Sequence, residues 1–317
     1  MFRYAFKRLL MLIPIILCAS LLLFTLVNSI PGDPAALILG EDSTETAKAE
    51  LREQLGLHNP FLVRYINYLK DLLHGDLGDS YYSREAVTVD LGIRLPNTIK
   101  LSLMAGLLSV LVGVSIGIIS AIRQYSWIDN IGTAFALFGA SAPSFWTALL
   151  FIILFSIRLD WLPSSGLYGP SYWILPVATL GLQQGSVIMR FTRSAMLDII
   201  RQDYVRTAYA VGEAEHQVIF KHILRNALMP IITAVGLCMC SMLTGAILVE
   251  SVFSIPGIGK YLIDSVYRRD QPAIMSTVLI ISIMCAVVNL IVDLLYAAVD
   301  PKIATMYAKK KRDKEAE

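Results

Sequence analysis

Six stretches of mostly apolar residues divide this chain. A transmembrane helix needs about 17–25 apolar residues, and each stretch is long enough to provide one. They run over residues 9–30, 99–122, 131–157, 173–189, 227–249 and 273–299. The pattern therefore predicts an all-α polytopic membrane protein with six transmembrane helices.

Composition agrees with this class. The chain of 317 residues is 56% hydrophobic and 16% charged, which excludes an ordinary soluble domain. The first apolar stretch follows Arg3, Lys7 and Arg8, as a secretory signal would. It is longer than the roughly 7–15 residues of a signal core, and residues 30–34 lack a small-residue cleavage pattern. We therefore expect it to remain as the first transmembrane helix.

Basic residues predict the orientation. They precede the first apolar stretch, follow the second and fourth, and recur in the tail 301–317. Because basic loops stay in the cytoplasm, both termini are predicted to be cytoplasmic. The acidic segment 31–95 is then extracytoplasmic. Lys260, Arg268 and Arg269 follow the fifth stretch and argue mildly against this orientation.

The segment 31–95 is predicted to contain two helices. One spans residues 44–55 with Thr44 as its cap, and Pro60 opens a second that runs to Leu73. Gly75 and Gly78 then indicate a turn. The segment is expected to form a small helical cap on the membrane domain, which is compatible with docking of an external partner.

A polar, helix-forming segment interrupts the apolar pattern after the fourth stretch, within residues 190–226. Asp203 is a candidate cap for a short helix through Val211, and Gly212 suits the left-handed position that ends a helix. Glu213 and Glu215 then lie at the positive start of a following helix. This helix–turn–helix fits either a docking surface or a surface helix that follows the membrane, and its pattern alone leaves both open.

The segment resembles the cytoplasmic coupling loop of ABC-transporter permeases, in the importer group for dipeptides, oligopeptides, nickel and glutathione. The matching residues include Asp203-Tyr-Val-Arg-Thr-Ala208, Gly212, His222-Ile-Leu-Arg-Asn-Ala227 and Pro230. Tyr209 and Val211 replace an Arg and a Lys that are usual in that group. The resemblance extends over nearly the whole chain through Pro31-Gly-Asp-Pro-Ala35, Leu55-Gly-Leu, His74-Gly-Asp-Leu-Gly78, Arg94-Leu-Pro-Asn-Thr98, Trp161-Leu-Pro163, Arg190-Phe-Thr-Arg-Ser194, Glu250-Ser-Val-Phe-Ser-Ile-Pro-Gly-Ile-Gly259 and Asp293-Leu-Leu-Tyr-Ala-Ala-Val-Asp-Pro301.

This resemblance implies a type I ABC importer permease fold in a bacterial or archaeal cytoplasmic membrane. It divides the chain into the N-terminus with the first helix (1–30), the extracytoplasmic segment (31–95), the permease domain (96–300) with its coupling loop (190–226), and the tail (301–317). The implied partners are a second, homologous permease, two cytoplasmic ABC ATPase subunits and an extracytoplasmic binding protein. The residues implied to couple to the ATPase are Tyr204, Arg206, Thr207, Ala208, Ala210, Gly212 and Glu213.

The chain itself is not expected to be an enzyme. Gly257-Ile-Gly-Lys260 suggests a phosphate-binding loop, but Ser254 and Tyr261 stand where that motif needs Gly and Ser or Thr. Histidine spacing indicates no metal site, and no nucleic-acid partner is expected. We therefore expect no cofactor in this chain, while ATP and Mg are used by the partner ATPase subunits.

Polar residues inside apolar stretches are candidates for the translocation pathway, because such residues are costly in lipid. Glu250, Asn289 and Asp293 are the principal candidates. Gln183, Gln184 and Asn226 form the wider set.

Small residues and prolines in the same stretches have structural explanations. Gly106, Gly113 and Gly117 are expected to make close helix contacts, and Pro143 and Pro176 are expected to kink helices.

The predicted function is that of a permease subunit forming half of the pathway for di- or oligopeptides delivered by the binding protein. Transport of nickel or a nickel chelate is the alternative within the group. An ion-coupled secondary transporter is an alternative of another class and would be expected to show inverted repeats, of which the sequence gives no clear sign.

Overall fold

The computed structural model describes residues 2–29, 32–40 and 42–299, and the regular elements in these ranges are helices. The predicted tail 301–317 lies outside the described residues. The helices are α1 (Phe2–Asn28), α2 (Pro34–Leu39), α3 (Glu45–Gln54), α4 (Phe61–Leu73), α5 (Val87–Ile122), α6 (Trp127–Ser141), α7 (Ser144–Phe151), α8 (Ile174–Ile200), α9 (Asp203–Ala210), α10 (Glu215–Gln217), α11 (Arg225–Val252), α12 (Ile258–Arg268) and α13 (Gln271–Val299). Two π-helical turns continue α7 and α10, at Ile152–Arg158 and Val218–Leu224, and a 3₁₀ turn, Pro170–Trp173, precedes α8.

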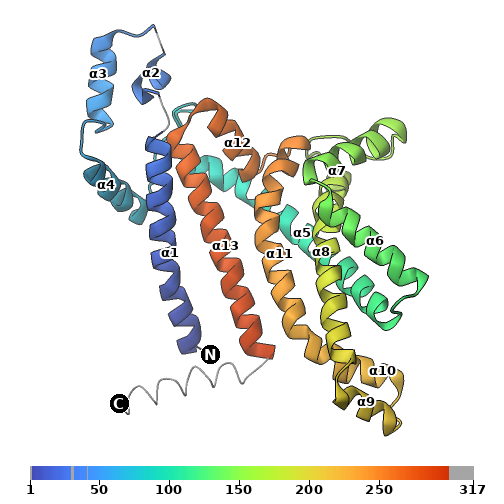
Figure 1. The fold of residues 1–317 in the computed structure, drawn as a ribbon. Helices are drawn as coiled ribbons and strands as arrows, with labels where there is room; N and C mark the ends of the chain where they lie inside the picture. The colour runs from blue at the N-terminus through green and yellow to red at the C-terminus, as the bar shows by residue number, and fades with distance from the viewer. Residues whose placement is uncertain (1, 30–31, 41, 300–317) are drawn as a thin grey trace, which may run out of the picture.

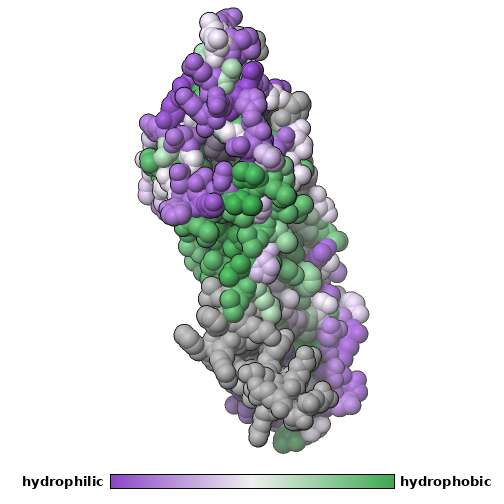
Figure 2. Space-filling view, turned by 90° about the vertical axis from the view of Figure 1, so that its left-hand side faces the viewer, coloured by the Kyte–Doolittle hydropathy of each residue, from purple (hydrophilic) through white to green (hydrophobic). Residues whose placement is uncertain are grey.

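The long helices stand side by side and separate two polar ends. α1 packs on α13, α13 on α11, α11 on α8, and α8 on α5. Figure 1 shows α2–α4 and α12 at one end of this row, and α9 and α10 at the opposite end with the start of α1. On the face turned to the viewer in Figure 2, a hydrophobic zone lies below a polar cap. This arrangement suits a protein whose middle is surrounded by lipid.

The packing of α5 on α8 depends on glycines. A Cβ atom at Gly113 would lie 2.5 Å from the carbonyl oxygen of Gly185, and one at Gly117 would lie 2.7 Å from the Cβ of Thr192. The two backbones are therefore in direct contact, as small residues allow between membrane helices. Gly106 lies equally close to Met239 of α11. The close contacts predicted for these glycines are confirmed.

The third predicted span, residues 131–157, is broken into two helices. α6 and the following α7 with its π-helical turn meet at a bend of 108°. Pro143 causes the break, because proline has no N–H to donate and keeps the preceding residue out of the helical region. Ala142 accordingly has φ −75° and ψ 127°. The kink predicted at Pro143 is thus present and is large enough to separate two helices.

Among the described residues, three helices are long and apolar enough to cross a membrane, and the bent pair would add a fourth if it forms one span. The predicted number of six spans therefore stays a prediction. α5 begins at Val87, twelve residues before the predicted span and inside the segment assigned to 31–95. Val87 and Leu91 are buried there against Ile258, Tyr261 and Ala273. Tertiary packing thus extends the helix beyond its apolar stretch.

The segment between α1 and α5 is helical, as predicted. Thr44 caps α3 by accepting a hydrogen bond from the backbone N–H of Ala47, and Pro60 precedes the first residue of α4. Gly75 and Gly78 have positive φ in the turn that follows. The short α2 was not predicted, and the side chain of Asp33 caps it.

Candidate functional site: the α9–α10 surface and the intramembrane polar residues

The predicted coupling segment folds as helix, turn and helix. α9 ends in a Schellman motif, in which the N–H of Glu213 bonds the carbonyl of Ala208 and the N–H of Gly212 bonds that of Tyr209. Gly212 has φ +88°, so the left-handed position predicted for it is confirmed. The prediction that Asp203 caps α9 is wrong, because Gln202 occupies the cap position and makes no side-chain bond. Asp203 lies instead in the first turn, where a negative charge is still favourable.

α9 is held against the ends of α8 and α11 by one buried side chain. Val205 is 1% exposed and packs in a cluster with Met196 of α8 and with Val218 and Ile223 of the π-helical turn. Burial of one face fixes the orientation of this short amphipathic helix. The other face is left to solvent.

Polar contacts tie the turn and α9 to the elements that follow. The Glu213 carboxylate lies 2.7 Å from Nε2 of His222 and 4.0 Å from Nζ of Lys221. The side-chain amide of Asn226 donates to the Tyr204 hydroxyl at 3.2 Å. Glu213 and Tyr204 therefore already have partners within the chain. Tyr204 joins α9 to α11, and Glu213 joins the turn after α9 to the π-helical turn.

The remaining candidates face outward. Arg206, Thr207, Ala210 and Gly212 are exposed, while Ala208 is half-buried. A Cβ atom at Gly212 would meet no atom within 4 Å. Three large apolar or aromatic side chains of α9 and the residues that follow it are also exposed, namely Tyr209 (46% exposed), Val211 (78%) and Phe220 (63%). Arg206, Thr207, Ala210 and Gly212 are thus accessible at the end of the helical row, whereas Ala208 packs against the buried cluster around Val205.

An ion pair that the sequence did not single out lies close to this surface. Arg193 of α8 binds Asp129 of α6, and Asp129 is 2% exposed. The Ser120 hydroxyl and the backbone N–H of Tyr125 also donate to the Asp129 carboxylate. The only available signal was Arg193 itself, within a motif quoted for the resemblance. Nothing in the sequence indicated Asp129, the partner of Arg193, which lies 64 residues earlier in the chain.

The three principal pathway candidates fall into two places. Asn289 and Asp293 of α13 line a cavity of about 720 Å³ between α1, α11 and α13. Oδ1 of Asn289 accepts a weak bond from the Cys240 thiol at 3.4 Å. Among the wider set, Gln183 and Gln184 border another cavity, of about 340 Å³, between α6, α8 and α11. Asn226 lies instead at the α9–α10 surface.

Glu250 lines neither of these two cavities and lies near the C-terminal end of α11. Its carboxylate is fully buried and accepts bonds from the Thr98 hydroxyl at 2.5 Å and from the backbone N–H groups of Gly259 at 2.8 Å and Lys260 at 3.1 Å. The Thr98 oxygen in turn accepts the N–H of Ile258 at 2.9 Å. Glu250 therefore joins α5, α11 and the first turn of α12. Its role in the pathway stays a prediction.

Within the described ranges, no group of three or more His, Cys, Asp or Glu side chains is placed to hold a metal ion. The arrangement offers surfaces for contact and polar positions between helices.

Two solved structures have a similar fold. One is a chain of the MetNI methionine ABC transporter in an inward-facing conformation, with a TM-score of 0.57 and 17% identity over 66% of this chain and 96% of that chain. The other is an amino acid ABC transporter with histidines, with a TM-score of 0.53 and 19% identity over 66% and 93%. These levels of identity show a shared fold.

Sequence relatives cover nearly the whole chain. The dipeptide transport system permease protein DppB of Alkalihalophilus pseudofirmus is 39% identical over 96% of this chain and 99% of its own length. The glutathione transport system permease proteins GsiC of Salmonella typhimurium and of Escherichia coli O6:H1 are 42% and 40% identical with the same coverage. These relatives are permease subunits and not enzymes.

Two family models together match most of the chain. The model for the binding-protein-dependent transport system inner membrane component matches residues 113–305, and the model for the N-terminal part of such components matches residues 1–102. The chain belongs to the family of inner membrane components of binding-protein-dependent transport systems, as the permease subunit of an ABC importer.

Proposed function

We propose that this permease forms half of a translocation pathway for short peptides, which an extracytoplasmic binding protein delivers. The observation that carries the proposal is the identity of 39–42% to dipeptide and glutathione permeases over 96% of the chain. Dipeptides and glutathione are both short peptides with charged ends. Nickel transport finds no support among these relatives, and membership of an ABC importer family decides against an ion-coupled secondary transporter.

The second half of the pathway would come from a homologous permease, and two ATPase subunits would supply the energy. The α9–α10 surface is the docking place we propose for one of them. It is exposed, it lies at one end of the helical row, and Val205 and the Glu213–His222 contact hold it in a fixed orientation. A partner shifts a conformational equilibrium only by binding the two states differently, so a rigidly mounted docking helix suits this role.

The proposed orientation places α9 and α10 in the cytoplasm and α2–α4 outside. It is supported by the basic residues at the start of the chain and in residues 190–225, and by the position of α2–α4 at the opposite end (Figure 1). Both termini would then be cytoplasmic.

The direct test is reconstitution of the permease with its partner permease, ATPases and binding protein in liposomes. ATP-dependent uptake of labelled dipeptide or glutathione is expected, and no uptake is expected with ATP omitted. Labelled nickel serves as a parallel substrate. Uptake of nickel but of neither peptide would overturn the proposed substrate class, and uptake driven by an ion gradient without ATP would overturn the mechanism.

A further inference from the structure

α4 has one apolar side that is exposed. Leu62, Ile66, Leu69 and Leu73 recur at intervals of four, three and four residues, so they form a single stripe along the helix. Leu62 is 67% exposed, Ile66 50% and Leu73 85%. Apolar surface of this extent is unfavourable in water and indicates a binding surface.

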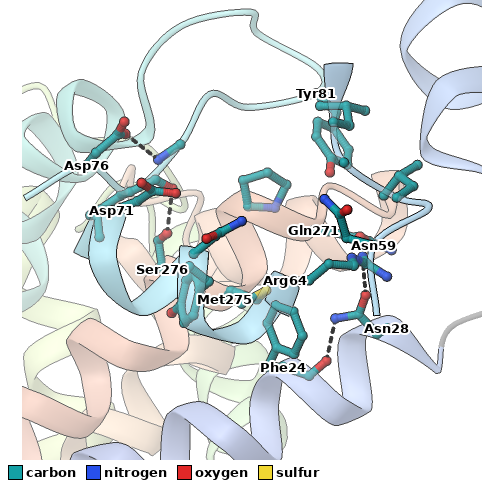
Figure 3. Close-up of a pocket in the computed structure, with 18 residues that line it drawn as sticks. Phe24, Asn28, Asn59, Arg64, Asp71, Asp76, Tyr81, Gln271, Met275 and Ser276 are labelled. Carbon is teal, nitrogen blue, oxygen red and sulfur yellow. Dashed lines mark hydrogen bonds between the residues drawn. The ribbon is translucent and has the colours of Figure 1, made fainter. Parts of the chain in front are cut away.

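The opposite side of the same helix is polar. Arg64, Asn67 and Asp71 lie about half a turn away from the stripe and line a cavity of about 270 Å³ between α4, α1 and the start of α13. Figure 3 shows Arg64 reaching toward Asn28 at the end of α1, and its guanidinium donates to the Asn28 side chain at 2.5 Å. α4 therefore has a polar side that lines a cavity and an apolar side that is exposed.

A third side of α4 fixes its depth beside α1. The rings of Phe61, Tyr65 and Tyr68 surround Phe24, with centroids 5.2, 5.4 and 5.7 Å away. The Tyr65 hydroxyl lies 2.9 Å from Oγ of Ser20 and donates to the carbonyl of Leu17 at 3.2 Å.

These partners lie well inside the first apolar stretch. Phe24 and Ser20 precede the end of α1 at Asn28 by four and eight residues, which is about 6 and 12 Å along the axis at 1.5 Å per residue. The hydrocarbon core is about 30 Å thick. α4 is thus packed beside the part of α1 that crosses or enters the bilayer.

Exposed side chains of α1 lie at the same level. Leu22 and Leu26 are each 65% exposed, and Leu21 is 40% exposed. If α1 spans the membrane, acyl chains cover these leucines, and the same acyl chains reach the stripe of α4. Depth and continuity with the lipid-facing surface of α1 therefore select lipid as the occupant.

We propose that α4 is an interfacial helix, with the stripe Leu62, Ile66, Leu69 and Leu73 in the acyl region of one leaflet and the Arg64–Asp71 side toward water. A helix of this kind lies in the plane of the interface with its apolar face buried by about 5–10 Å. It fixes the segment 32–86 to the membrane surface and leaves α2 and α3 as the parts that extend into water. The proposal does not depend on the transported substrate.

Spin labels report the environment of each side directly. In the full chain with Cys18, Cys238, Cys240 and Cys285 replaced by Ala, Ile66→Cys and Leu73→Cys would place labels on the stripe. Glu53→Cys on α3 is the matched control in water. After reconstitution in phospholipid nanodiscs, collision rates are measured with oxygen, which partitions into lipid, and with a water-soluble nickel chelate.

Labels at Ile66 and Leu73 are expected to collide with oxygen several-fold more than with the chelate, whereas the label at Glu53 should show the reverse order. Equal access of the chelate to all three positions would place the stripe in water and overturn the proposal. Exclusion of both reagents from Ile66 and Leu73 would mean that protein covers the stripe, and it would overturn the proposal as well. A cooperative thermal transition of each labelled variant, at the temperature found for the Cys-free chain, verifies that the variant is folded.

Discussion

Arg193 of α8 binds the carboxylate of Asp129 in α6 through two hydrogen bonds, of 2.6 Å from Nε and 2.7 Å from the guanidinium NH₂ group. The pair connects α6 to α8. It also involves α5, because the hydroxyl of Ser120 in α5 donates to the same carboxylate. It lies ten residues before α9 begins at Asp203. The pair therefore holds three helices together next to the proposed docking surface.

Asp129→Ala should lower the free energy of unfolding by about 3 kcal/mol, at the low end of the range for breaking a buried pair, because Arg193 is a quarter exposed. Thermal unfolding in detergent measures the change. Asp198→Ala, on the exposed side of α8, is the control and should change stability little. Equal stability of the two variants would contradict a structural role for the pair.

Gly212→Val should impair ATP-dependent uptake while the protein still folds. Space around the position is open, so the cost comes from φ +88°, which a β-branched residue rarely adopts. Gly212→Asn should retain most activity, because Asn tolerates the left-handed region. Uptake and ATPase stimulation are measured together.

A valine variant at a second glycine distinguishes a general effect of backbone strain from an effect specific to the α9–α10 surface. Gly40 also has open space and a positive φ, of +91°, but it lies in the segment of α2 and α3. Gly40→Val should leave coupling between ATPase activity and uptake intact. If both valine variants uncouple equally, the effect does not come from the α9–α10 surface.

Glu250→Ala should destabilise the contact between α11 and α12. The change leaves Thr98 and the N–H groups of Gly259 and Lys260 without their acceptor in a buried place, at a cost of about 1–3 kcal/mol for each unsatisfied group. Thermal unfolding and uptake per folded molecule are measured, with the exposed Glu53→Ala as control. A normal transition temperature with lost uptake would contradict the structural explanation and favour a direct role in the pathway.

Acid should loosen α2 from α3. The hydrogen bond from Arg52 holds the pKa of Asp33 below its ordinary value of 3.8, and the N–H of Ala35 acts in the same direction. Because the folded pKa is depressed, this contribution to stability is present above pH 3.8 and is lost as the pH falls through the folded pKa.

Distances between spin labels at Leu37→Cys and Glu53→Cys in the Cys-free chain measure this loosening. Their distribution should be narrow at neutral pH and broaden below the folded pKa of Asp33. Asp33→Asn should give the broad distribution at every pH. A wild-type distribution that stays narrow throughout the acid range would show that Asp33 does not hold α2 to α3.

Local signals predicted the elements that local chemistry determines. Thr44 and Pro60 indicated where α3 and α4 begin, and Gly212 indicated the end of α9, because caps and left-handed positions depend on a few adjacent residues. Apolar stretches likewise placed the cores of α1, α5, α8, α11 and α13.

Contacts between distant residues could not be predicted from one sequence. Thr98 and Glu250 are separated by 152 residues, and Ser80 and Asp270 by 190. The early start of α5 depends on burial of Val87 by α12 and α13, which no local pattern records. The bend at Pro143 was foreseen as a kink, but its size of 108° depends on the packing of α7 against α8 and α11.

The glycine contacts between α5 and α8 have a mechanical consequence. Two helices whose backbones touch cannot slide or separate without losing that fit, so α5 and α8 are expected to move as one rigid body. α9 is attached to one end of this body, and Thr98, which binds Glu250 of α11, lies toward the other end. A displacement of α9 by an ATPase would thus tilt α5 and α8 together and move the end of α5 that contains Thr98.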